Sequence, residues 1–271
     1  MSIVNRQPDE IDPASPLAAW LASPQGQYVL RWEQQKFDLV CADIFGFNAV
    51  QLGEPVFDCL RANRVPHKFR CGLTAGAEVR SQLTELPFAS QSIDLVVLPH
   101  VLEFSDNPHQ ILREVERILV PEGQVLIAGF NPFSLWGIKR AWAKPSETFP
   151  WRGQYLAVKR LRDWLKLLGM ETQAGAFGCY VPPVLSEKWL ERWDFMARAG
   201  DRWWPYAGAV YVIQAVKRVP GMRLIRPAWR KRSARRALSA VVQRDGAEIH
   251  ADTHATLEAH LNPHFQPENR R

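Results

Sequence analysis

The sequence has few cysteines, and none of them form a close pair. The four thiols are far apart in the 271 residues and form no Cys-x-x-Cys motif: Cys41, Cys59, Cys71 and Cys179. Structural zinc sites and disulfide frameworks depend on closely spaced ligands, and the histidines near the C-terminus have no such partners. We therefore expect reduced thiols, a cytoplasmic location and no metal site.

Long apolar runs are also missing. No segment approaches the roughly 18 apolar residues of a membrane-spanning helix, so no membrane span is expected. Residues 1–15 are polar and contain three acids, which argues against a signal peptide and favours a flexible lead-in. The apolar fraction of 46% still supplies a buried core.

Acidic residues are scarce only at the C-terminal end. Residues 217–271 hold 12 Lys or Arg against 5 Asp or Glu, whereas the rest of the chain holds 22 against 23. We therefore expect a domain over residues 16–217 and a basic, disordered tail over residues 218–271. Residues 218–236 contain eight basic side chains and no acid, and could bind nucleic-acid phosphates. A solvated tail without a partner is the alternative.

Residues 86–131 carry the clearest structural pattern. The apolar run at 93–98 predicts a strand that is buried on both faces. Apolar residues then recur at helical spacing, at Ile111, Leu112, Val115 and Ile118. We expect residues 121–123 to end this helix and residues 124–130 to form a second strand. Strand, helix and strand make a βαβ unit of a parallel sheet.

This stretch resembles the later half of the class I S-adenosylmethionine-dependent methyltransferase domain, of the type 11-like kind. The resemblance rests on Leu86-Pro87-Phe88, the Asp94 strand and the motif formed by Glu114, Arg117, Leu119, Pro121 and Gly123. It implies an α/β fold with a Rossmann-like seven-stranded methyltransferase sheet, in which Leu86-Pro87-Phe88 closes the third strand. Trp20, Pro24 and Gly26 before a long helix resemble the N-terminal helical cap of an uncharacterised bacterial subgroup.

The resemblance also implies S-adenosyl-L-methionine as the cofactor, and it places residues around it. In the family, the turn after the first strand, the loop before the fourth strand and the turn after the fourth strand lie around the cofactor. The corresponding residues here are Leu52, Gly53, Glu54, Gln82, Leu83 and Pro99. Three features depart from the family pattern: the glycine motif is degenerate, no acid ends the second strand, and Gln82 replaces the usual Asp.

The turns at the carboxyl ends of the central strands supply the remaining candidates, because doubly wound folds bind ligands there. His100 follows the fourth strand and is our candidate catalytic residue, as a base or an orienting group; a buried structural histidine is the alternative. Glu103, Asn131 and Trp136 are candidates for the substrate pocket. A helix start or a plain turn would also explain Glu103 and Asn131.

The other elements follow from composition and from the family order. We expect a helix near 28–44, a short helix over 56–62, a second strand near 67–71 and a helix from 158 to 169. A sixth strand over 171–180 and a seventh over 211–217 would close the sheet. Between these two strands, the segment 182–206 holds four of the eleven tryptophans. It is either an aromatic lid over an apolar acceptor or the buried stripe of a helix.

Three functional hypotheses follow. The first is a methyltransferase that acts on an unidentified, small or apolar acceptor. The second is a catalytically degenerate binding protein with the same fold, which the three cofactor-side departures favour. The third is a nucleic-acid methyltransferase tethered by the basic tail, although residues 98–101 lack the motif of amino-directed base methyltransferases.

Overall fold

The computed structural model describes residues 16–54, 57–74, 76–143, 149–183, 204 and 206–219, all within one compact unit that ends at Met222. The expected lead-in, most of the segment 182–206 and the basic tail beyond Val219 lie outside the described residues. No helix of the described part is long and apolar enough to cross a membrane.

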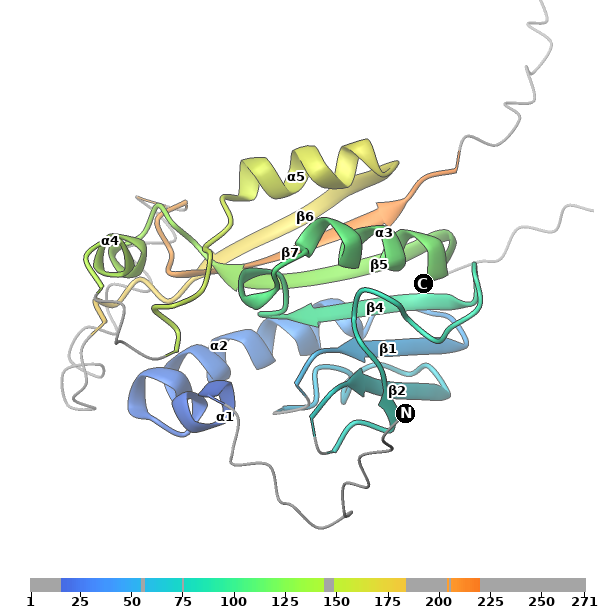
Figure 1. Ribbon diagram of the computed structural model, residues 1–271, viewed down its shortest axis with the longest axis horizontal. Helices are drawn as coiled ribbons and strands as arrows, with labels where there is room; N and C mark the ends of the chain where they lie inside the picture. Colours follow the sequence, from blue (N-terminus) through green and yellow to red (C-terminus); the bar gives the residue numbers. More distant parts are fainter. Residues whose placement is uncertain are drawn as a thin grey trace, which may run out of the picture. The chain divides into compact units, whose positions relative to one another are not determined.

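The centre of the unit is a seven-stranded sheet with the order β3-β2-β1-β4-β5-β7-β6 (Figure 1). In this described sheet, β7 runs antiparallel to both of its neighbours, β5 and β6, and the other neighbouring pairs are parallel. This confirms the predicted seven-stranded methyltransferase sheet. The strands are β1 (Asn48–Leu52), β2 (His67–Gly72), β3 (Val79–Arg80), β4 (Ile93–Pro99), β5 (Leu119–Phe130), β6 (Met170–Gly178) and β7 (Val210–Lys217).

Helices cover both faces of the sheet (Figure 1). Alternate residues of β4 divide between the two layers: Val96 and Leu98 pack with α3 and α5, while Leu95 and Val97 pack with α2. This double burial explains the continuous apolar run of β4. The helices are α1 (Pro16–Leu21), α2 (Pro24–Cys41), α3 (Pro108–Ile118), α4 (Leu135–Ala141) and α5 (Val158–Leu167), with a 3₁₀ turn, η1 (Leu102–Phe104).

Three local predictions were wrong. Leu86-Pro87-Phe88 lies in a loop, and the third strand is β3, only two residues long. The described residues of the expected helix at 56–62 form turns, because Gln51 in β1 bonds Phe57 O and Cys59 N through its side chain and fixes a tight loop. β5 begins at Leu119, directly after α3, so residues 121–123 form an irregularity inside the strand instead of ending the helix.

The other element predictions were confirmed within a few residues, including the helix near 28–44, α5 and the last two strands. All four cysteines are free and buried. Arg218, placed at the start of the tail by composition, is held by the domain. Its backbone N–H donates to Gly169 O (3.0 Å) and its guanidinium pairs with Glu171 and Glu122.

Candidate functional site

A cavity of about 500 Å³ lies at the carboxyl ends of β1, β2 and β4. This is the sheet edge where doubly wound folds bind ligands. Much of its wall is apolar, with Phe104 and Phe149 stacked at a centroid distance of 4.5 Å on one side. The lining residues are Pro16 and Leu17 of α1, Gly53 and Glu54, residues 72–74, residues 82–84, residues 99–101, residues 104–106, Ile111 and Phe149.

Two glycines bring the strand ends together at the floor of the cavity. Gly53 has a φ of +98°, and a Cβ added there would lie 2.7 Å from Val101 Cγ2. A Cβ on Gly72 would lie 2.4 Å from Gly53 O. Both positions therefore require glycine for internal packing: at Gly53 because of its left-handed backbone, and at Gly72 because β1 approaches it closely.

The cavity wall contains a buried hydroxyl without a partner. Thr74 Oγ1, just beyond the end of β2, makes no hydrogen bond with any part of the chain that the structure describes. No Asp or Glu ends β2, as the sequence indicated. A buried polar atom without a partner is costly, which makes Thr74 a natural contact for a ligand in this cavity.

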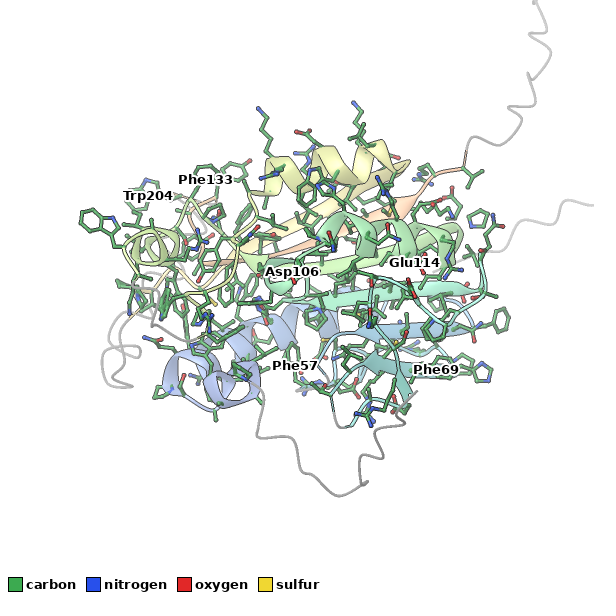
Figure 2. The ribbon with its side chains drawn as sticks, in the orientation of Figure 1. Phe57, Phe69, Asp106, Glu114, Phe133 and Trp204 are labelled. Carbon is green, nitrogen blue, oxygen red and sulfur yellow. The ribbon has the colours of Figure 1, made fainter. Side chains whose placement is uncertain are left out.

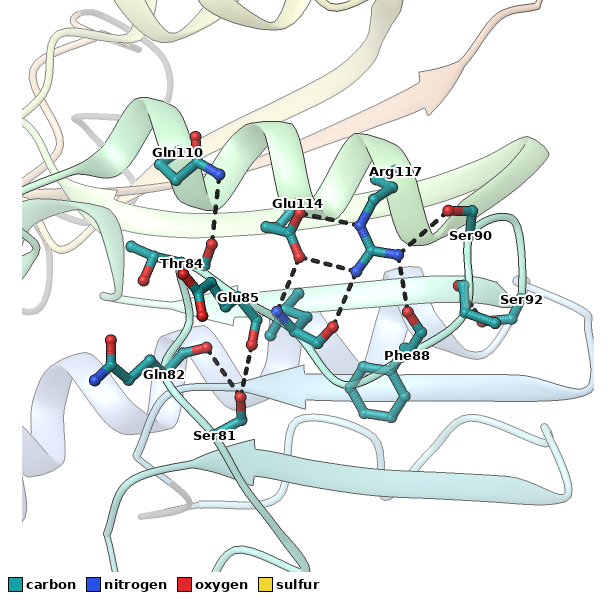
Figure 3. A network of polar contacts seen from close by, with 12 residues as sticks. Ser81, Gln82, Thr84, Glu85, Phe88, Ser90, Ser92, Gln110, Glu114 and Arg117 are labelled. Atoms are coloured by element: carbon teal, nitrogen blue, oxygen red, sulfur yellow. Dashed lines mark hydrogen bonds and ion pairs between the residues drawn. The ribbon is translucent and has the colours of Figure 1, made fainter.

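An ion pair on α3 fixes the loop that carries residues 82–84 to the cavity (Figure 3). Glu114 accepts from Leu86 N–H (2.9 Å) and pairs with Arg117 (2.8 Å). Arg117 in turn donates to Leu86 O and Phe88 O, both at 2.9 Å. The Glu-x-x-Arg motif of the sequence thus anchors the loop to the helix, which accounts for Leu86-Pro87-Phe88 lying outside any strand.

The imidazole of His100 is clamped between two buried carboxylates. Its Nε2 lies 2.7 Å from Glu33 Oε1 on α2, and its Nδ1 lies 3.1 Å from Glu103 Oε1. All three side chains are 0–1% exposed. The backbone of His100 has a φ of +52°, an uncommon value for a residue other than glycine. The triad therefore ties the N-terminal helix α2 to the turn after β4.

Burial opposes the charged form of His100, but the two carboxylates outweigh it and raise the pKa of His100 from 6.5 to about 10. The imidazole is then a cation at neutral pH and both of its N–H groups donate. Glu103 Oε1 also accepts from Phe130 N–H (2.7 Å). The second carboxylate oxygens of Glu33 and Glu103 are buried and have no partner among the described residues.

The cavity contains six of the ten predicted site residues: Gly53, Glu54, Gln82, Leu83, Pro99 and His100. The other four do not line it. Leu52 is fully buried in the core, and Glu103 belongs to the triad. Asn131 Nδ2 donates to Tyr206 O and Gly208 O, and Trp136 Nε1 donates to Val181 O (2.8 Å), so both hold loops together.

With both nitrogens bound to carboxylates, the His100 side chain has no nitrogen left to accept a proton from a substrate. This geometry favours the structural histidine that the sequence left open as the alternative, and a catalytic role for His100 remains a prediction. Within the described ranges, no cluster of three or more His, Cys, Asp or Glu side chains could hold a metal ion.

Sequence reasoning missed Glu33, although a signal was present. Val29, Glu33, Phe37 and Cys41 follow one another at intervals of four on α2, and all four are buried. A carboxylate within such a stripe needs a buried partner, which indicates an ionic contact. Thr74, Phe104 and Phe149 were also missed, and nothing in their local pattern distinguishes them from ordinary loop residues.

Comparison with known proteins supports the methyltransferase fold. Residues 58–127 match the family model described as "Methyltransferase domain". The chain is 28% identical over 155 residues to the uncharacterized protein YafS of Escherichia coli, covering 56% of this chain and 64% of that one. It is 35% identical over 107 residues to a malonyl-[acyl-carrier protein] O-methyltransferase of Halorhodospira halophila, covering 40% of this chain and 32% of that one.

Solved structures agree with this fold. A chain in the complex between the Haloferax volcanii Trm112 methyltransferase activator and a methyltransferase aligns with a TM-score of 0.53 at 15% identity, over 78% of this chain and 99% of that one. A SAM-dependent methyltransferase of Archaeoglobus fulgidus gives 0.50 at 14% identity, over 70% and 94%. Residues 58–127 thus resemble the methyltransferase domain family, and the described sheet has the class I S-adenosylmethionine-dependent methyltransferase fold.

Proposed function

We propose that this protein is an S-adenosylmethionine-dependent methyltransferase that acts on a small or apolar acceptor. The observation that carries the proposal is the cavity at the carboxyl edge of a methyltransferase sheet, bounded by Gly53 and the turn at 99–101. The apolar wall that includes Phe104 and Phe149 favours an apolar acceptor. One relative is named as an O-methyltransferase, which makes oxygen one candidate for the accepting atom.

S-adenosyl-L-methionine is the cofactor of this fold family, and the cavity fits it. A volume of about 500 Å³ is within the usual range of small-molecule sites. The unpartnered hydroxyl of Thr74 marks where a polar ligand group would lie against the end of β2. We propose that Gly53, Glu54, Thr74, Gln82, Leu83 and Pro99 hold the cofactor.

The sulfonium of the cofactor supplies an activated methyl group. Methyl transfer then depends mainly on in-line positioning and on exclusion of water. The stacked rings of Phe104 and Phe149 shield one side of the cavity from solvent. The Glu33–His100–Glu103 triad fixes the turn whose next residue, Val101, packs against Gly53. These residues position the reactants without taking part in the proton transfers.

An acceptor that must lose a proton needs a base other than the bound imidazole. Glu54 and Asp106 are the carboxylate residues that line the cavity, and both lie on loops at its edge. We propose that one of them takes this role where the acceptor requires it. An acceptor whose accepting atom carries no proton at neutral pH, such as a carboxylate oxygen, needs no base.

A catalytically degenerate binding protein is the second candidate. The engaged nitrogens of His100 and the lack of a carboxylate at the end of β2 favour it. Nucleic-acid methylation through residues 218–236 depends on a segment that lies outside the described residues beyond Val219, and it remains a hypothesis from composition alone.

The test is transfer of a radiolabelled methyl group from S-adenosylmethionine. Purified protein is incubated with labelled cofactor and a total cell extract that has been separated into organic, aqueous and nucleic-acid fractions. We expect the wild type to transfer label to the organic fraction, and we expect Gly53→Ala to transfer none. Label in the nucleic-acid fraction would overturn the acceptor class. Binding of S-adenosylhomocysteine without transfer to any fraction would favour the degenerate binding protein.

A further inference from the structure

Large apolar side chains are exposed on and around α4. Phe133 is 75% exposed, Ile138 59% and Trp142 85%, with Leu135 also exposed. Residues 135, 138 and 142 follow helical spacing, so they share one face of the helix. Figure 2 shows Phe133 and Trp204 at the same end of the unit as α4. We call this set (Phe133, Leu135, Ile138, Trp142, Trp204 and Tyr206) the α4 surface.

The opposite face of α4 fixes the orientation of this surface. Trp136 is 1% exposed, donates to Val181 O and stacks on Phe130 at a centroid distance of 6.2 Å. Ser134 caps the helix by accepting from Gly137 N–H (3.0 Å). Tyr206 O accepts from Asn131, just before the helix. The exposed side chains are therefore held outward by a rigid base, as in a preformed interaction surface.

In the described segments that flank the α4 surface in sequence, every charged residue is basic. The described residues of 131–143, 149–160 and 204–209 contain no Asp or Glu, whereas Lys139, Arg140 and Arg152 lie among them. Lys139 Nζ lies 4.4 Å from the centroid of Trp151, which holds this cation beside the apolar stripe. An apolar stripe with aromatic residues and flanking cations is the pattern of helices that bind the interface of anionic membranes.

We propose that the α4 surface binds peripherally to anionic phospholipid membranes. The aliphatic side chains of Leu135 and Ile138 favour a lipid surface over single-stranded nucleic acid, whose bases stack on aromatic rings and gain little from aliphatic groups. The aromatic layer beneath α4 continues to the cavity, since Trp20 contacts both Trp136 and Phe149, at 6.1 and 5.2 Å. Membrane binding by this surface does not depend on methyl transfer.

The test is co-sedimentation of the full-length protein with vesicles of phosphatidylcholine alone and with about a third phosphatidylglycerol. The first variant is Ile138→Ser/Trp142→Ser. Its matched control is Phe45→Ser/Phe47→Ser, which removes two side chains that are 75% and 72% exposed at the amino end of β1, the other end of the sheet. All four positions are exposed, so folding is checked by circular dichroism and is expected to be unchanged.

We expect the wild type and the control to bind the anionic vesicles, and the α4 variant to lose about tenfold or more in partition coefficient, since two large apolar side chains no longer enter the interface. Lys139→Gln/Arg140→Gln provides a second variant. It should weaken binding to the anionic vesicles but not to vesicles of phosphatidylcholine alone. Equal binding by all variants would assign any membrane affinity to another part of the chain. Equal binding of this kind would overturn the proposal. So would a wild type that binds no vesicles, or one that binds an oligonucleotide through Ile138 and Trp142 instead.

Discussion

Replacing His100 with Asn tests the buried triad. Asn tolerates the left-handed backbone found at this position, so the substitution removes the cation without adding backbone strain. It leaves two carboxylates, Glu33 and Glu103, buried without their shared partner. Breaking a buried ionic contact in this way costs about 3–5 kcal/mol. For a unit of this size, the melting temperature should fall by about 6–20 °C.

The pH dependence of this loss gives a sharper test. Folding raises the pKa of His100 above its usual 6.5, to about 10, so the folded state stabilises the protonated form. That contribution is fully present below pH 6.5 and is lost as the pH rises toward 10, and the whole difference corresponds to about 5 kcal/mol. The stability gap between wild type and His100→Asn should therefore be widest near pH 6.5 and narrow steadily toward pH 10.

Urea denaturation of both proteins at intervals from pH 6 to pH 10 measures this gap. His67→Asn is the control, because His67 lies exposed at the start of β2. Its stability should follow that of the wild type at every pH. A gap for His100→Asn that stays constant with pH would refute the reasoning, because it would mean that the imidazole in the folded protein is neutral throughout this range.

Three further substitutions test the cavity. Gly53→Ala should lower the free energy of unfolding by at least about 1–2 kcal/mol, because φ is +98° and the methyl group would meet Val101; urea denaturation measures this. Thr74→Val should leave the stability of the free protein unchanged but weaken S-adenosylhomocysteine binding about tenfold in calorimetric titration; unchanged affinity would exclude a role for the hydroxyl. Glu114→Ala should cost about 1–3 kcal/mol and also weaken binding, since Leu86 N–H loses its acceptor; normal binding would show that the loop needs no such anchor.

The sequence was sufficient to predict the sheet because the information is local and periodic. β4 is a continuous apolar run that both layers bury, and α3 has one clear apolar face. The third strand could not be predicted, since it is only two residues long and carries no apolar pattern. Its expected position, Leu86-Pro87-Phe88, instead forms a loop whose conformation depends on the side chains of Glu114 and Arg117.

The site was predicted less completely, because its contacts join distant segments. Glu33 and His100 are 67 residues apart in sequence and meet only once α2 has packed against the sheet. Its position after the fourth strand placed His100 at the ligand-binding edge, but the sequence could not reveal that carboxylates bind both nitrogens. The hydroxyl of Thr74 is likewise noticeable only because the folded chain leaves it buried and without a partner.

Calorimetric titration of the wild type with S-adenosylhomocysteine tests the central claim most directly. We expect binding of one ligand per chain, accompanied by a rise in melting temperature. At about a hundred times the dissociation constant, the ligand should stabilise the fold by about 2.7 kcal/mol. The absence of both heat and thermal shift at millimolar ligand would contradict the account, since the cavity between Gly53 and Thr74 would then not be a cofactor site.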